Sequence, residues 1–183
     1  MTSFSTMLRI GIWIVLLGGG IAAGRWLDTR WFSSLWVNPA WHMASLVMGA
    51  ALLWLVVLAS RNTGRTLSAY GREGDLPRLE TNRLVTTGVY SCMRHPMHFA
   101  LLFLPLALAL IIGSPGFVFV VAPLEILFML FMIATLEEAE VKHKFGEAYS
   151  AYRQQVPAFS LKPSCLKILF GGTADTATGK DHV

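Results

Sequence analysis

The sequence is poor in charged residues and in cysteine. Of its 183 residues, 14% are charged and 54% are hydrophobic, whereas an ordinary soluble domain has about 25% charged residues. The shortage of charge excludes a soluble enzyme, and the abundance of apolar residues excludes a disordered chain. Two cysteines are also too few for a disulfide-stabilised scaffold. The composition is that of an integral membrane protein.

The apolar stretches are long enough to cross a bilayer. A transmembrane helix needs about 20 residues to span a hydrocarbon core of roughly 30 Å. Apolar runs of about this length occur at 8–24, 41–60, 97–113 and 117–136. The sequence therefore predicts an all-α fold, a polytopic membrane helix bundle of about four transmembrane helices. At this length we expect one domain over residues 1–163, followed by a flexible tail at 164–183.

The first run has a second interpretation. Arg9, an apolar stretch and Ala22-Ala23-Gly24 together fit a cleavable signal peptide. Gly18-Gly19-Gly20 in the middle of the run favours a retained helix, because glycines allow close helix packing.

The basic residues fall into two segments that predict the topology. Lysine and arginine are enriched on the cytoplasmic side of membrane proteins. Four spans with both termini and the candidate site inside satisfy this rule. The net charge of +4 is then a topology signal and a contact for anionic lipid, not a sign of nucleic-acid binding. Cys92 and Cys165 both fall on this reducing side, so we expect no disulfide. The two segments hold Arg61, Arg65, Arg72, Arg78, Arg83 and Arg94, and then Lys142, Lys144, Arg153, Lys162, Lys167 and Lys180, whereas the other two connections hold only Arg25 and Arg30.

The connections between the runs differ in length and character. The stretch 25–40 is rich in tryptophan and predicts an interfacial loop, and 61–94 predicts a functional loop with short helical pieces. Ser114-Pro115-Gly116 is a minimal turn, which predicts a tight hairpin of the third and fourth helices. Pro105 and Pro123 should kink these helices. After Leu136 the spacing of Phe145, Tyr149 and Tyr152 predicts a cytoplasmic helix that ends near Pro157.

Polar residues gather at the two ends of this predicted hairpin. Arg94 and His95 precede the third span, and Glu137 and Glu138 follow the fourth, so the hairpin would make them neighbours. One interpretation is a structural group of salt bridges at the membrane boundary. The other is a site for a ligand with one cationic and one anionic end, held by the glutamates and by Arg94 or His95.

The order of these motifs resembles the isoprenylcysteine carboxyl methyltransferase and phospholipid methyltransferase superfamily. The matching residues are Leu84-Val85-Thr86-Thr87-Gly88-Val89-Tyr90, Arg94-His95-Pro96, Glu137-Glu138, Phe145-Gly146-Glu147-Ala148-Tyr149 and Val156-Pro157. The resemblance implies a membrane enzyme that transfers a methyl group from S-adenosylmethionine to a lipophilic acceptor. It implies catalytic roles for Arg94, His95, Glu137 and Glu138. The cofactor contacts that it implies are Asn82, Arg83, Leu84, Val85, Tyr90, His95, Pro96, Met97, His98 and Glu137.

Two departures from the family pattern bear on the acceptor. His98 stands where the family usually has tyrosine. Ile133 stands where the prenylcysteine enzymes have an arginine that binds substrate, and without that cation a buried carboxylate would be unpaired. We therefore expect an amino-lipid head group or a thiol rather than a prenylcysteine carboxylate.

Glu125 lies within the fourth apolar run. It is expected either to contact substrate or to be a protonated side chain bonded to a neighbouring helix. Two rival classes remain at this point, a structural or regulatory membrane protein and a haem protein. His42 and His98 begin spans that run in opposite directions, so this pair could not ligate one haem. The oligomeric state is left open.

Overall fold

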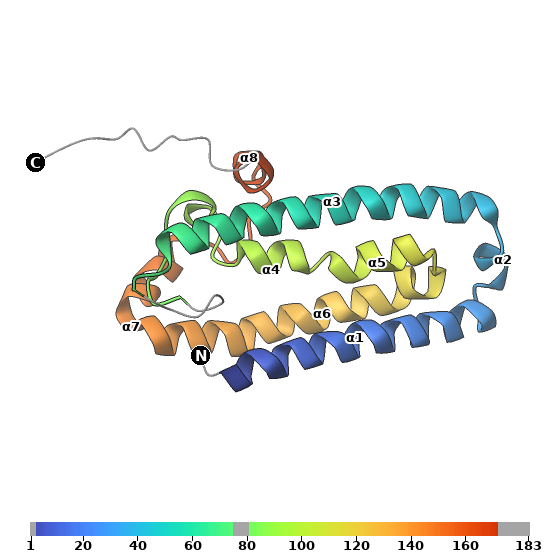
Figure 1. Cartoon of the computed structure of the whole chain (residues 1–183), viewed down its shortest axis with the longest axis horizontal. Coiled ribbons are helices and arrows are strands. Elements are labelled where there is room, and N and C mark those ends of the chain that lie inside the picture. Colours follow the sequence, from blue (N-terminus) through green and yellow to red (C-terminus); the bar gives the residue numbers. More distant parts are fainter. Residues whose placement is uncertain (1–2, 75–80, 172–183) are drawn as a thin grey trace, which may run out of the picture. The chain divides into compact units, whose positions relative to one another are not determined.

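Helices account for all the regular structure in the residues described by a computed structural model, 3–74 and 81–171 (Figure 1). The prediction of an all-α fold is therefore confirmed for this part of the chain. Two short π-helical segments, η2 and η3, flank α6, and a short 3₁₀ helix, η1, precedes α4. The elements are α1 (Ser3–Arg30), α2 (Ser33–Trp36), α3 (Pro39–Tyr70), η1 (Gly88–Ser91), α4 (Pro96–Leu101), α5 (Leu104–Ile112), η2 (Phe117–Val121), α6 (Ala122–Met132), η3 (Ile133–Glu137), α7 (Glu138–Gln155) and α8 (Pro163–Gly171).

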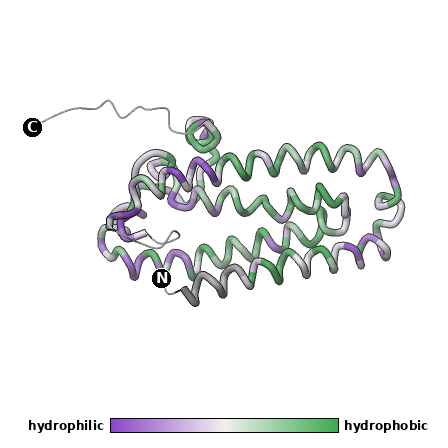
Figure 2. The backbone as a smooth tube through the Cα atoms, viewed as in Figure 1, coloured by the Kyte–Doolittle hydropathy of each residue, from purple (hydrophilic) through white to green (hydrophobic). Residues whose placement is uncertain are grey.

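Two of the described helical segments are long and apolar enough to cross a membrane. They are α3 and the continuous run Phe117–Gln155, while Pro96–Ile112 is a shorter apolar segment. Only 22% and 28% of their most apolar windows are buried, whereas a core helix of a soluble protein would be mostly buried. Large apolar side chains such as Trp54 and Phe131 are 66% and 62% exposed. Figure 2 shows apolar residues along these helices, as expected of surfaces that face lipid.

The helix boundaries differ from the predicted spans in two places. Helix α3 continues ten residues past Ser60, to Tyr70, into the stretch expected to be loop. Much of the predicted interfacial loop 25–40 is also helical, in α1, α2 and the start of α3. Local polarity set the predicted boundaries, but a helix satisfies its own backbone hydrogen bonds and can continue into a polar environment.

Of the two prolines in the apolar runs, only Pro105 coincides with a break in its helix. It lies in the first turn of α5, after the turn that separates α5 from α4, where the N–H that it lacks has no partner within the helix. Pro123 lies where π-helical η2 passes into α6 within the continuous run Phe117–Gln155. The intervening connection includes Gly113, whose φ of 73° is the left-handed conformation that favours glycine.

One compact unit comprises residues 1–56 and 102–135. In it, α1 packs closely on η2, since a Cβ at Gly24 would lie 2.7 Å from the Cβ of Phe117. Gly20 makes a similar approach, but Gly18 and Gly19 have open space around them, so the predicted packing role applies only to the third glycine of that triplet. Fully buried Asp28 accepts a hydrogen bond of 2.7 Å from the N–H of Gly116.

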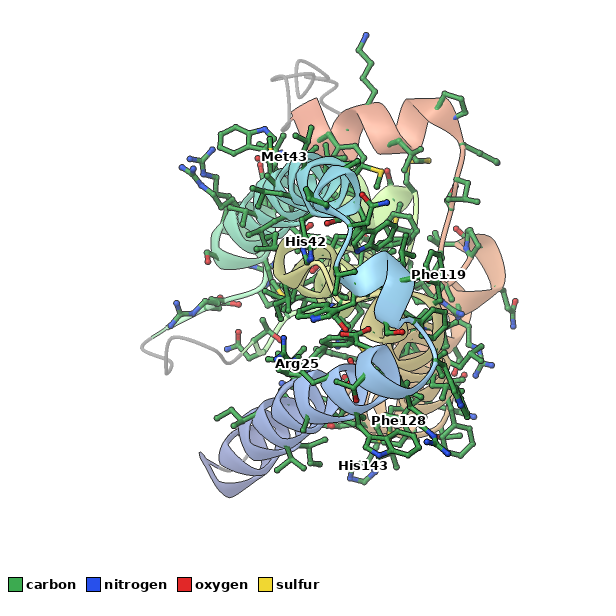
Figure 3. All side chains as sticks on the ribbon, turned by 90° about the vertical axis from the view of Figure 1, so that its right-hand side faces the viewer. Arg25, His42, Met43, Phe119, Phe128 and His143 are labelled. Carbon is green, nitrogen blue, oxygen red and sulfur yellow. A yellow bond between two sulfur atoms is a disulfide. The ribbon has the colours of Figure 1, made fainter. Side chains whose placement is uncertain are left out.

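Helix α2 is fixed within this unit by two side chains labelled in Figure 3. The guanidinium of Arg25 lies 4.4 Å from the centre of the Trp36 ring, a cation–π contact. His42 Nε2 lies 2.6 Å from the carbonyl oxygen of Trp36. A carbonyl only accepts, so this nitrogen carries a proton and is not free to ligate a metal.

The second compact unit comprises residues 57–101 and 136–183. Its core joins α3, η1, α4 and α8, and Cys165 and Leu169 give α8 its buried face. The amide of Asn62 donates to the carbonyls of Leu169 and Phe170 at 2.9 and 3.2 Å. These bonds satisfy carbonyls that the helix end would leave unpaired. The first part of the predicted flexible tail 164–183 is therefore a packed helix, and residues 172–183 lie outside the described part.

The prediction that the two cysteines stay unpaired is wrong. Cys92 and Cys165 form a disulfide, and their Cα atoms are 5.6 Å apart, within the usual range for this bond. The prediction considered only the compartment, whereas the packing of α8 beside η1 brings the two residues together.

Candidate active site

The carboxylate of Glu138 is the centre of a buried ion cluster in the second unit. Its Oε1 atom lies 2.6 Å from Nε2 of His95 and 3.3 Å from Nη2 of Arg94, and it accepts a hydrogen bond of 2.9 Å from the hydroxyl of Tyr149. Its Oε2 atom lies 3.4 Å from Nε of Arg153. The side chains of Arg94, His95 and Glu138 are each less than 10% exposed. Because a carboxylate only accepts, Nε2 of His95 carries a proton.

Backbone hydrogen bonds hold the segment that carries two of these residues. The N–H groups of Arg94 and His95 donate to the carbonyls of Pro157 and Ala158 at 3.0 and 3.2 Å. Pro96 then begins α4, where its missing N–H costs nothing. The chain that follows α7 thus fixes the position from which both side chains start.

Helix α7 bends at Gly146, between Glu138 and the tyrosine that contacts it. This glycine has φ 56° and ψ −130°, outside the helical region, and such a φ is costly for residues with a Cβ. Beyond the bend, Tyr149 contacts Glu138, and the hydroxyl of Tyr152 donates to the carbonyl of Tyr90 at 2.5 Å. The bend therefore separates the start of α7, which bears Glu138, from the turn that bears its tyrosine partner.

The electrostatic environment keeps Glu138 ionised. Burial opposes ionisation, but hydrogen bonds from His95 and Tyr149 and the charge of Arg94 outweigh it and lower the pKa of this carboxyl. Glu138 follows the apolar part of its helix, which ends at Leu136. Burial raises the pKa of Tyr90 well above its ordinary value, so its phenol is neutral at physiological pH.

A cavity of about 120 Å³ opens beside the cluster. Six of the predicted site residues line it: Arg83, Leu84, Val85, Tyr90, Arg94 and His95. The aromatic side chains of Phe145, Tyr149 and Tyr152 contribute to the same lining. Nε and Nη1 of Arg94 are buried and have no hydrogen-bond partner. An arginine that lines a cavity with two free donors is suited to a carboxylate ligand.

Other predicted site residues lie apart from this lining. Glu137 pairs with His98, whose Nε2 is 3.8 Å from its Oε1. Asn82 closes a turn by hydrogen bonds of 2.8 and 2.7 Å with the backbone N–H and carbonyl of Glu73. Pro96 and Met97 are also absent from the lining. The second glutamate of the pair, not the first, therefore joins the arginine and histidine.

Glu125 belongs to the first unit, where it faces α1. It is buried, and a Cβ at Gly20 would lie 2.5 Å from its Oε1. Its Oε2 has no hydrogen-bond partner. The carboxyl group therefore lies against a neighbouring helix and keeps one free oxygen.

Sequence reasoning did not assign Tyr149, Tyr152 and Arg153 to the site. The tyrosines were predicted only as part of an apolar stripe, although their spacing from Phe145 within a family-like motif was the available signal. No signal in the sequence singled out Arg153. Among the described residues, no group of three histidine, cysteine or acidic side chains is placed to hold a metal ion.

Comparison with known protein families gives a match over the segment that carries most of the cluster. A family model described as phospholipid methyltransferase matches residues 41–148. No curated protein and no solved structure matches the chain. The matched segment contains Arg94, His95 and Glu138, and ends one residue before Tyr149.

Proposed function

Because the chain belongs to the phospholipid methyltransferase family, a family of membrane methyltransferases, we propose that it transfers a methyl group from S-adenosylmethionine to a lipophilic acceptor at the Glu138 cluster. The observation that carries this proposal is the pair of free, buried donors on Arg94 beside the cavity. S-Adenosylmethionine has a carboxylate that is proposed to accept a hydrogen bond from one of these donors, and it supplies a methyl group activated by a sulfonium sulfur. Glu138 holds the guanidinium in place through its Nη2 atom.

The lining of the cavity suits the rest of the methionine end. Tyr90 and Phe145 line the cavity, and their aromatic rings are proposed as contacts for the cationic sulfonium. At about 120 Å³ the cavity is smaller than the roughly 300–1,000 Å³ of typical ligand pockets. We assign it to the methionine end, with Asn82, Pro96, Met97, His98 and Glu137 as outer contacts.

His95 is proposed to take up a proton from the acceptor. Since Nε2 carries the proton that faces Glu138, Nδ1 is the basic nitrogen of the neutral ring. An amine must lose a proton as it becomes methylated, and Nδ1 is assigned to accept it. Glu138 stabilises the imidazolium that results. Exclusion of water by the buried cluster favours transfer over side reactions.

The acceptor is proposed to be an amino-lipid head group or a thiol. Ile133 is buried and apolar, and stands where the prenylcysteine enzymes carry a substrate-binding arginine. Glu125, with its free oxygen, is proposed as a contact for the acceptor. We further propose four spans with a hairpin of the third and fourth, and both termini and the site on the cytoplasmic side.

Methyl transfer with labelled S-adenosylmethionine tests the proposal. The protein is reconstituted in vesicles that contain phosphatidylethanolamine, a lipid thiol or a farnesylated cysteine, and mass spectrometry identifies the product. We expect label in the amino-lipid or the thiol, loss of transfer in Arg94→Met and retained transfer in Glu147→Gln, an exposed glutamate on α7. Folded protein that labels none of the acceptors contradicts the proposal, and methyl ester formation contradicts the assigned acceptor class.

A further inference from the structure

Arg61 and Arg65 form a basic surface on α3. Both are exposed and lie one helical turn apart. Among the described residues, neither takes part in an ion pair. Like charges at positions i and i+4 destabilise a helix. An anionic ligand between the two guanidinium groups would turn this repulsion into attraction.

A shallow hollow lies between the two arginines. Its other lining residues are Gly64, Ser68 and Ala69. A Cβ at Gly64 would have a single neighbour within 4 Å, the Cε of Met97 at 4.0 Å, so packing does not require glycine there. Glycine inside a helix is less favourable than alanine. Its presence keeps the space between the arginines open.

The hollow lies at the depth expected for lipid phosphates. Arg65 follows the end of the apolar run, Ser60, by five residues, which is roughly 8 Å along a helix that rises 1.5 Å per residue. The head-group layer adds about 5–8 Å to each side of the hydrocarbon core. A lipid whose chains lie beside the apolar run would therefore bring its phosphate to this level.

We propose that Arg61, Arg65 and Ser68 bind the phosphate of an anionic glycerophospholipid. Two guanidinium groups provide paired N–H donors that match phosphate oxygens, and the hydroxyl of Ser68 adds a third donor. Gly64 and Ala69 allow the head group to approach the helix. The proposal depends on the membrane location of α3 and not on methyl transfer, so either can fail without the other.

Lipid binding by the full-length protein tests this site directly. The protein is stripped of lipid in a neutral detergent and titrated with phosphatidylglycerol, phosphatidylcholine or inorganic phosphate, and native mass spectrometry counts the bound molecules. We expect phosphatidylglycerol to bind in preference to phosphatidylcholine. Arg61→Gln/Arg65→Gln should weaken its binding by about 25-fold, or about five-fold per arginine.

Two further variants separate the site from general charge and from misfolding. Gly64→Leu keeps both arginines and favours the helix, but it fills the hollow, so phosphatidylglycerol binding should weaken. Lys162→Gln/Lys167→Gln removes two exposed cations of the same unit that lie outside the hollow, and binding should be retained. Unchanged binding in the arginine variant, or an equal loss in the lysine variant, overturns the proposal. Displacement by an equal concentration of inorganic phosphate overturns the assignment to lipid.

Discussion

The Nε2 atom of His95 lies 2.6 Å from the Oε1 atom of Glu138, although 43 positions separate the two residues in the sequence. The contact joins the start of α4 to the start of α7 in the second unit. Because Arg94 shares the same carboxylate oxygen, one acidic side chain orients both proposed functional groups.

The pairing of Glu138 should make stability sensitive to acid. A carboxyl whose pKa is lowered on folding stabilises the protein above its unfolded pKa of about 4.3. This contribution is lost as the pH falls below that value and through the lower folded pKa. Unfolding temperatures measured by circular dichroism from pH 7 to pH 3 should therefore decline in acid more steeply for the wild type than for Glu138→Gln. Glu147→Gln should follow the wild type, and identical profiles for all three proteins would contradict the assignment.

Arg94→Lys should weaken cofactor binding while leaving the ion pair with Glu138 possible. Lysine keeps the charge but lacks the planar guanidinium, whose Nε and Nη1 donors are without a partner in Arg94. Loss of a charged hydrogen bond of about 1.5–3 kcal/mol predicts affinity for S-adenosylmethionine lower by about 10- to 150-fold in calorimetry. Arg30→Lys, at an exposed arginine outside the site, is the matched control. Equal affinity in both variants would remove Arg94 from the proposed binding site.

Tyr149→Phe should destabilise the protein without changing its charge. The buried hydroxyl donates to the Glu138 carboxylate, and hydrogen bonds to charged groups contribute about 1.5–3 kcal/mol. A lower unfolding temperature is the expected result. Tyr70→Phe, which changes a tyrosine that is 57% exposed, should have little effect. If the two variants unfold at the same temperature, the hydrogen bond does not stabilise the fold.

Reduction of the Cys92–Cys165 disulfide should loosen the attachment of α8. The bond joins residues 73 positions apart, and disulfides typically contribute about 2–4 kcal/mol by restricting the unfolded chain. A reductant should lower the unfolding temperature of the wild type but not that of Cys92→Ser/Cys165→Ser. Alkylation of both cysteines in the native protein without reductant would show that the pair is not formed.

Cysteine labelling in intact cells should distinguish the two sides of the membrane. In a background of Cys92→Ser/Cys165→Ser, the variants Val37→Cys and Thr87→Cys place single thiols at exposed positions. The proposed four-span topology predicts that an impermeant reagent reaches the first thiol from outside and leaves the second unlabelled. The reverse pattern would invert the topology, and equal labelling would be incompatible with it.

The site was more predictable from the sequence than the details of its packing. The positions of Arg94, His95 and the glutamate pair near the ends of apolar runs indicated that they would meet. The choice between Glu137 and Glu138 could not be made this way, because neighbouring helical residues point in directions about 100° apart. The π-helical turn η3 precedes Glu138 and rotates the side chains that follow it about the helix axis. This rotation determines which of the two glutamates faces His95.

Long-range packing accounts for what the sequence did not indicate. Cys165 was assigned to a flexible tail, yet Asn62 of α3 satisfies carbonyls at the end of the helix α8 that carries it. Tyr149 could not be assigned to the site from the sequence either, because its contact with Glu138 depends on the bend at Gly146. A glycine in a helical pattern does not by itself specify whether the chain bends or continues.

The backbone bonds from Arg94 and His95 to Pro157 and Ala158 also define how much of the chain must be kept when relatives are compared or chimaeras are built. The family match stops at residue 148, before either carbonyl acceptor and before the hydroxyl that contacts Glu138. A graft confined to the matched segment would carry the arginine, histidine and glutamate into a new protein but leave behind the backbone that aligns them. Transplanted activity should therefore require a donor segment that extends at least through Ala158.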